Sequence, residues 1–138
     1  MEQVLTFRLG AEHYGLEIAH LQEIVESPPI YQVPRGADWL LGAINVHGSI
    51  LPVLDLAALL GFDNRERDPR VIVLSREFGR LALAVAALGK IVPLDPDALL
   101  PVQQQEQQTA CIRGVLNLEA DMVNLLDMER LLGSLEKI

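Results

Sequence analysis

The start of the chain, up to Ile18, alternates between apolar and polar side chains, a pattern typical of two short β-strands. In Val4–Leu9, the side chains of Leu5, Phe7 and Leu9 share one side of the chain, which predicts a strand with one buried face. After a Gly-Ala-Glu turn, His13–Ile18 alternates in the same way. The two segments therefore predict an antiparallel hairpin.

A helix-like spacing follows this first predicted hairpin. Leu21, Ile24 and Val25 are placed as on one side of a helix. Pro28 and Pro29 come directly afterwards, and the residue before a proline is disfavoured in the helical conformation. We therefore expect only a brief helix in this connection.

A second hairpin is predicted from Trp39–Val46 and Ile50–Leu54, two apolar runs separated by His-Gly-Ser. Gly48 can take the positive φ that a tight turn needs. Pro52 lies in the returning strand and has no N–H to donate. We therefore expect that strand at the edge of its sheet, or bulged at the proline.

A short helix is predicted directly after the second hairpin. Asp55 has a side chain suited to a helix N-cap, Leu56–Leu60 is apolar, and Gly61 is suited to end a helix. The aspartate, a pair of leucines and the glycine recur at matching positions as Asp127, Leu131-Leu132 and Gly133.

This recurrence belongs to a longer internal repeat. Gly42–Gly61 matches Gly114–Gly133 without a gap, and seven of the 20 positions are identical. Upstream, Tyr14–Ile24 matches Leu81–Ile91, and these two segments are slightly closer together in the sequence than the downstream pair. The chain therefore predicts two copies of one unit, each with a hairpin, a connection, a second hairpin and a short helix.

The repeat leads to an all-β fold of two small barrels in one domain, residues 1–138. The predicted subdomains span about residues 3–62 and 70–134. Four or five short strands do not bury both faces as a flat sheet, whereas closure into a barrel removes the exposed edges. The polar segment 63–69 is expected to be a linker, and the Gln-rich run 103–108 a solvated loop.

Composition excludes several classes of function. The 138 residues carry 19 acidic and 11 basic side chains, a net charge of −8, so we expect no nucleic-acid partner. The longest charge-free stretch is too short to span a bilayer, which excludes membrane insertion. The N-terminus lacks the pattern of a signal peptide, so we expect a cytoplasmic protein. The single cysteine, Cys111, is expected to be a buried thiol.

The residues that bear catalytic or metal-binding side chains form no complete constellation. Ser49 lies near His47, but no third group in the pattern would orient the imidazole. His13, His20 and His47 could ligate a metal only if the fold gathered them. Motifs for phosphate and cofactor binding are absent from the sequence, so we expect no catalytic residue, metal or cofactor. A protein-binding adaptor remains.

Several blocks of sequence, in this order and spacing, carry a resemblance to a known family. They are Phe7-Arg8-Leu9-Gly10, Tyr14-Gly15-Leu16-Glu17-Ile18, Leu21-Gln22-Glu23-Ile24, Val33-Pro34, Gly42 to Leu56, Leu83-Ala84-Val85 and Gly114 to Leu132. With these blocks the chain resembles the chemotaxis coupling protein CheW and the CheW-like domains over nearly its whole length.

The resemblance implies two SH3-like five-stranded barrels around a shared apolar interface. It also implies a cytoplasmic, non-enzymatic scaffold that bridges the regulatory domain of a CheA-type histidine kinase to the cytoplasmic tips of chemoreceptors. Matched by position, the partner-binding residues would be Leu21, Glu23, Gly42, Asn45, His47 and Gly48. Leu21 has a second interpretation as ordinary core, because apolar residues at this spacing are usually buried.

The sequence departs from the family pattern at two positions. His47 stands where the family usually has arginine, and Ala86 where it usually has aspartate. Three explanations are open: the partner contacts have shifted, the chain serves another chemosensory array such as one for twitching motility, or one of the two partners has been lost.

Overall fold

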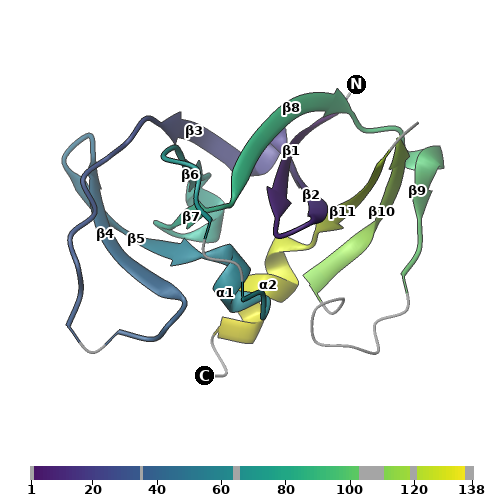
Figure 1. Cartoon of the computed structure of the whole chain (residues 1–138). Coiled ribbons are helices and arrows are strands. Elements are labelled where there is room, and N and C mark those ends of the chain that lie inside the picture. The colour runs from purple at the N-terminus through teal and green to yellow at the C-terminus, as the bar shows by residue number, and fades with distance from the viewer. Residues whose placement is uncertain (1, 35, 64–65, 103–110, 119–120, 136–138) are drawn as a thin grey trace.

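The computed structural model describes residues 2–34, 36–63, 66–102, 111–118 and 121–135 (Figure 1). The predicted Gln-rich loop, residues 103–108, lies outside the described residues. The elements in chain order are β1 (Gln3–Leu9), β2 (Glu12–Glu17), η1 (Ile18–His20), β3 (Leu21–Val25), β4 (Leu40–Val46), β5 (Ser49–Asp55), α1 (Leu56–Leu59), β6 (Val71–Leu74), η2 (Arg76–Phe78), β7 (Ala82–Ala84), β8 (Ala87–Pro93), η3 (Pro96–Ala98), β9 (Leu99–Leu100), β10 (Ile112–Leu118), β11 (Asp121–Leu126) and α2 (Met128–Leu135).

The strands form two sheets, which confirms the prediction of a mainly β fold with short helices. One sheet has six strands in the order β8-β1-β2-β11-β10-β9, and the other has five in the order β3-β6-β7-β5-β4. The sheets occupy two lobes side by side, and α1 and α2 lie at their junction (Figure 1). Closure of each sheet into a barrel stays a prediction.

The strands of the two sheets do not follow the predicted subdomain boundaries. β1 and β2 belong to the first copy of the repeat, yet they pair with β8 and β11 of the second copy. In return, β6 and β7 of the second copy pair with β3 and β5 of the first. The division into residues 3–62 and 70–134 is therefore wrong for the sheets. The two copies exchange their first hairpins. The sequence pattern could not predict this exchange, because periodicity within a strand carries no information about which strands are its neighbours.

The internal repeat is confirmed by the way in which the strands of the two copies pair. Asn45 pairs with Ile50, and Asn117, the matching residue of the second copy, pairs with Met122. Both hairpins contain a register shift at the same place, between Leu40 and Gly42 in one and between the matching residues 112 and 114 in the other. The two segments therefore have the same pairing, as their sequence match predicts.

Both copies also cap their helices in the same way. The Oδ1 atom of Asp55 accepts a hydrogen bond of 3.3 Å from the N–H of Ala58, and Oδ1 of Asp127 accepts one of 3.1 Å from the N–H of Arg130. These bonds satisfy N–H groups that have no partner in the first turn of a helix. The predicted N-cap at Asp55 is confirmed.

A single large core lies between the sheets. It gathers buried side chains from both sheets and both helices: Leu5, Phe7, Leu9, Tyr14, Leu16, Leu54, Leu56, Ile72, Leu74, Leu83, Leu126, Met128 and Leu131. Val4, on the opposite face of β1, is also fully buried, in a smaller cluster within the six-stranded sheet. The expectation that β1 buries only one face is therefore wrong, because each sheet has apolar residues packed on both of its faces.

Two local predictions also differ from the structure. Residues Leu21–Val25 form strand β3, since pairing with β6 overrides the helix-like spacing. Pro52 lies on β5, which is flanked by β4 and β7 and is therefore not an edge strand. The proline is tolerated because pairing with the short strand β7 begins only at Val53.

Candidate functional site

A two-residue turn between β4 and β5 carries much of the candidate site. His47 and Gly48 have φ angles of 51° and 85°, as in a type I′ turn, whose twist matches that of the flanking strands. The Oδ1 atom of Asn45 accepts a hydrogen bond of 3.0 Å from the N–H of Gly48. All three residues are exposed. The local sequence thus folds into a tight turn that presents the imidazole to solvent.

Strand β3 brings Glu23 to this turn. Oε1 of Glu23 lies 2.9 Å from Nε2 of His47, and the two side chains are 31% and 76% exposed. β3 and β4 are the two edge strands of the five-stranded sheet. Glu23 is on β3 and His47 follows β4, so their contact links the two edges of the sheet. An exposed pair of this kind contributes about 0–1 kcal/mol to stability. Its main effect is to hold two polar side chains together at the surface.

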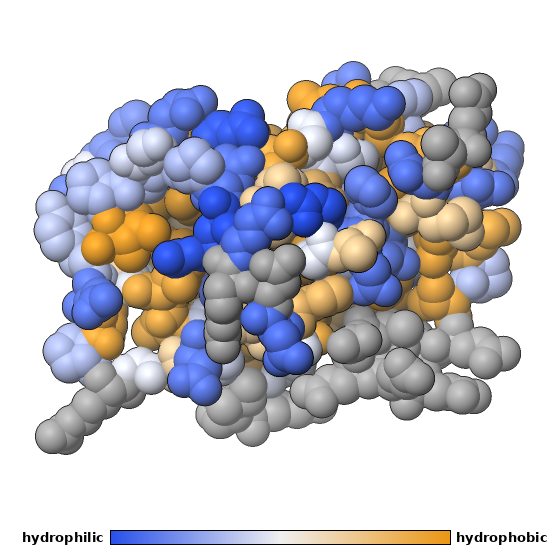
Figure 2. All heavy atoms as spheres, viewed as in Figure 1, coloured by the Kyte–Doolittle hydropathy of each residue, from blue (hydrophilic) through white to orange (hydrophobic). Residues whose placement is uncertain are grey.

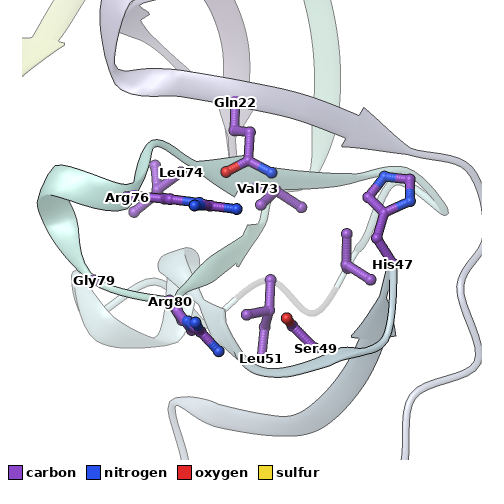
Figure 3. A pocket seen from close by; sticks show the side chains of 10 residues that line it. Gln22, His47, Ser49, Leu51, Val73, Leu74, Arg76, Gly79 and Arg80 are labelled. Carbon is purple, nitrogen blue, oxygen red and sulfur yellow. The ribbon is translucent and has the colours of Figure 1, made fainter.

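A hollow of about 110 Å³ lies next to the turn (Figure 3). The β4–β5 hairpin, β3, β6 and the η2 region all contribute to its wall. Its lining residues are Gln22, Val46, His47, Ser49, Leu51, Val73, Leu74, Arg76, Gly79 and Arg80. The apolar side chains belong to β4, β5 and β6. Both arginines are exposed, and sequence reasoning did not select either of them.

Leu21 and Gly42 are placed differently from the rest of the predicted site. Leu21 is half-buried and packs against the large core between the sheets. Gly42 is buried and has a φ of 150°, and a Cβ atom there would collide with the backbone carbonyl of Tyr31. The structure therefore gives Gly42 a packing role, which is to let the segment before β4 approach the strand.

Large apolar side chains are exposed beside the turn. Tyr31 is 64% exposed and Ile50 is 63% exposed. Tyr31 bridges to Ala43, which pairs with Pro52, so Tyr31 and Ile50 lie on the same outer face of the hairpin. On the face of the molecule in Figure 2, apolar patches surface on both lobes with polar residues between them. Sequence reasoning did not select either Tyr31 or Ile50.

The three histidines do not come together. His13 lies 3.7 Å from a carboxylate oxygen of Asp121, and Nδ1 of His20 lies 3.7 Å from Glu17. His47 has its own partner on β3. Within the ranges that the structure describes, no group of three metal-ligating side chains is gathered.

The second departure from the family pattern lies away from the turn. Ala86 is only 4% exposed, and its N–H donates a hydrogen bond of 3.1 Å to the carbonyl of Arg8. A partner would not reach this side chain directly. Cys111 is also buried, as predicted, and burial raises the pKa of its thiol.

Comparison with known proteins identifies the family. The model of the CheW-like domain matches residues 3–136. The chain belongs to the CheW-like domain family. This membership confirms the resemblance found in the sequence, and it extends over both sheets and both helices.

Relatives of similar length come from several bacteria. The chain is 26% identical to a probable chemotaxis protein CheW of Rhizobium etli, over 97% of this chain and 89% of the relative. It is 27% identical to a chemotaxis protein CheW of Klebsiella aerogenes, over 98% and 84%. The crystal structure of the scaffolding protein TtCheW from Thermoanaerobacter tengcongensis superposes with a TM-score of 0.82 at 26% identity, covering 91% of this chain and 88% of that one.

The helices of the chain are short. In the portion that the structure describes, none has the length and apolar character needed to cross a membrane.

Proposed function

We propose that this chain is a non-enzymatic adaptor that couples chemoreceptors to a CheA-type histidine kinase in the cytoplasm. The observation that carries the proposal is the match over nearly the whole chain to a CheW scaffolding protein of the same fold. The relatives named chemotaxis proteins support it, because the matched region covers most of their length as well as most of this chain.

The proposed partners are the regulatory domain of the kinase and the cytoplasmic tip of a receptor. The surface that we assign to partner contact is the turn Asn45, His47 and Gly48 together with Glu23. Leu21 and Gly42, which the resemblance also matches to partner contact, lie in the packing of β3 and β4 instead. Charged and polar groups at a rim act on the rate and specificity of association more than on folding, so such a surface suits exchangeable complexes.

A kinase assay tests the proposed coupling. Purified kinase and receptor fragments should show receptor-dependent phosphorylation only when this chain is added. Binding of each partner alone should be measured by titration calorimetry, because an adaptor that has lost one partner would bind only one of the two. Absence of binding to both partners would contradict the proposal.

The Glu23→Lys variant tests the assigned surface. We expect binding of at least one partner to weaken by about tenfold, which corresponds to ~1.4 kcal/mol. The change in unfolding free energy should stay within about 1 kcal/mol, because the side chain pairs at the surface. Asp121→Lys is a matched control, since Asp121 is also an exposed acid beside a histidine, but in the six-stranded sheet. Equal weakening in both variants would point to overall charge as the cause.

A further inference from the structure

Two arginines line the hollow beside the turn. Arg76 lies in η2 and Arg80 follows it, and Figure 3 shows both side chains in the lining of the hollow, with His47 on the opposite side. The amide of Gln22 and the hydroxyl of Ser49 are further hydrogen-bond donors in the lining. The polar part of the hollow can therefore donate several hydrogen bonds, and two of its donor groups carry a permanent positive charge.

These two arginines differ from most others in the molecule. Arg8, Arg70, Arg113 and Arg130 each pair with a carboxylate at 2.8–3.5 Å. Arg76 and Arg80 pair with no carboxylate among the residues described, although the chain has 19 acidic side chains.

The nearby acids are already engaged. Glu23 contacts His47 and does not line the hollow. Glu77, between the two arginines in sequence, accepts a hydrogen bond of 3.2 Å from the hydroxyl of Ser75 and does not line the hollow. A concave cationic site therefore stays open to an external anion, in a chain whose net charge is −8.

The size of the hollow limits what it can accept. Sites for small-molecule ligands have volumes of roughly 300–1,000 Å³, whereas this one is about 110 Å³. Leu51, Val73 and Val46 supply an apolar lining. This combination suits one side chain with an apolar stem and a carboxylate end. It is too small for a nucleotide or a similar cofactor.

We infer that this hollow binds a single acidic side chain, glutamate or aspartate, of a protein partner that docks on the His47 turn. The inference rests on the proposed adaptor function, because it concerns the same surface. Arg76 and Arg80 grip the carboxylate, and planar guanidinium groups are well matched to carboxylate geometry. The arginines thus select a partner that presents an acid at this position, while the exposed apolar face nearby contributes contact area.

The double variant Arg76→Gln, Arg80→Gln tests this site. Its affinity for the kinase regulatory domain and for the receptor fragment should be measured by titration calorimetry at low and moderate salt. We expect at least tenfold weaker binding of one partner and a shallower salt dependence. Arg80→Lys should be intermediate, because lysine keeps the charge and loses the fork. The unfolding midpoint should not change, since both side chains are exposed and unpaired among the described residues.

Arg67→Gln is the matched control. Arg67 is another exposed arginine without a carboxylate partner in the described part of the chain, and it lies outside this hollow. Its replacement should change affinity by less than about twofold. Wild-type affinity in the double variant, or an equal loss in the control, would overturn the inference and leave the adaptor function standing.

An acetate titration tests the hollow without either partner. The Nε–H signals of Arg76 and Arg80 should shift in a saturable way in the NMR spectrum, and that of Arg67 should not. Uniform shifts of all three signals would overturn the carboxylate site. Tight binding of inorganic phosphate that leaves partner affinity unchanged would likewise overturn it, by showing a site for a free anion. In the calorimetric experiment, a wild type that binds neither protein would instead contradict the adaptor function.

Discussion

Glu23 and His47 join the two outer parts of the five-stranded sheet, with 2.9 Å between Oε1 and Nε2. The glutamate is on edge strand β3, and the histidine is in the turn after β4 at the other edge. The ion pair therefore depends on the whole path of the sheet. The contact is an ion pair only while the imidazole carries its second proton.

We predict that partner binding strengthens as the pH falls from 8 to 6. A protonated His47 adds positive charge to the lining of the hollow, across from Arg76 and Arg80. His47→Arg should strengthen binding at pH 8 and flatten the pH dependence, because the guanidinium stays charged throughout. Titration calorimetry at both pH values measures this. Weaker binding of His47→Arg would show a partner adapted to a neutral imidazole. Equal affinities of wild type and variant at both pH values would show that His47 is not in the interface.

Leu54 and Leu126 should contribute equally to stability. They occupy matching positions in the two copies and are 2% and 0% exposed in the core between the sheets. Each replacement by alanine should lower the unfolding free energy by about 2–5 kcal/mol. Urea unfolding measures the effect, and Ile50→Ala, at an exposed position, is the control. A loss below about 1 kcal/mol in either leucine variant would contradict the shared core.

Asp68 should make the protein sensitive to acid. Its side chain is 7% exposed and accepts hydrogen bonds of 2.9 Å from Nε and Nη2 of Arg70 and of 2.8 Å from the N–H of Leu88. The Arg70 side chain holds the pKa of Asp68 well below its usual range, against the effect of burial, and the N–H groups of Leu88 and Arg70 lower it further.

The direction of the pH effect follows from this lowered pKa. The carboxylate stabilises the fold in full above about pH 4, the unfolded value, and this contribution is lost as the pH falls below it. Asp68→Asn should cost about 1–3 kcal/mol at pH 7 and less at pH 3. Urea unfolding at the two pH values tests this. A difference between wild type and variant that does not shrink in acid would contradict it.

Separated halves of the chain should not fold alone. A fragment of residues 1–62 holds β1 and β2 without β8 and β11, and a fragment of residues 66–138 holds β6 and β7 without β3 and β5. We expect neither fragment to unfold cooperatively, whereas an equimolar mixture should regain the circular dichroism and melting of the intact chain. Cooperative melting of either fragment by itself would contradict this.

Local patterns predict much of this fold, and the reason is visible in particular residues. The type I′ turn needs Gly48, the helix cap needs Asp55, and alternation marks the hairpins, all within a few positions of sequence. The strand conformation of Leu21–Val25 depends on β6, which lies far along the chain, and the burial of Val4 depends on β8 and later strands. Such long-range pairing leaves no local signal.

The candidate site divides in the same way. Glu23 and His47 follow from the family resemblance, and the structure brings them into contact. Gly42 matches the family by position, but in the structure a glycine is needed there because any side chain would collide with the carbonyl of Tyr31. Arg76 and Arg80 face a hollow whose other wall belongs to the earlier β4–β5 hairpin, so their proximity to His47 is visible only in three dimensions.

The exchange of hairpins has a consequence for descent. In each copy of the repeat, the first hairpin and the later strands belong to different sheets. An ancestral gene encoding only one copy could form these pairings only as a symmetric dimer, with each subunit giving its first hairpin to the other. Duplication and fusion of that gene would then join the two subunits without altering a single strand pair. The unequal spacing of the matching segments shows that the connections in the two halves now differ in length.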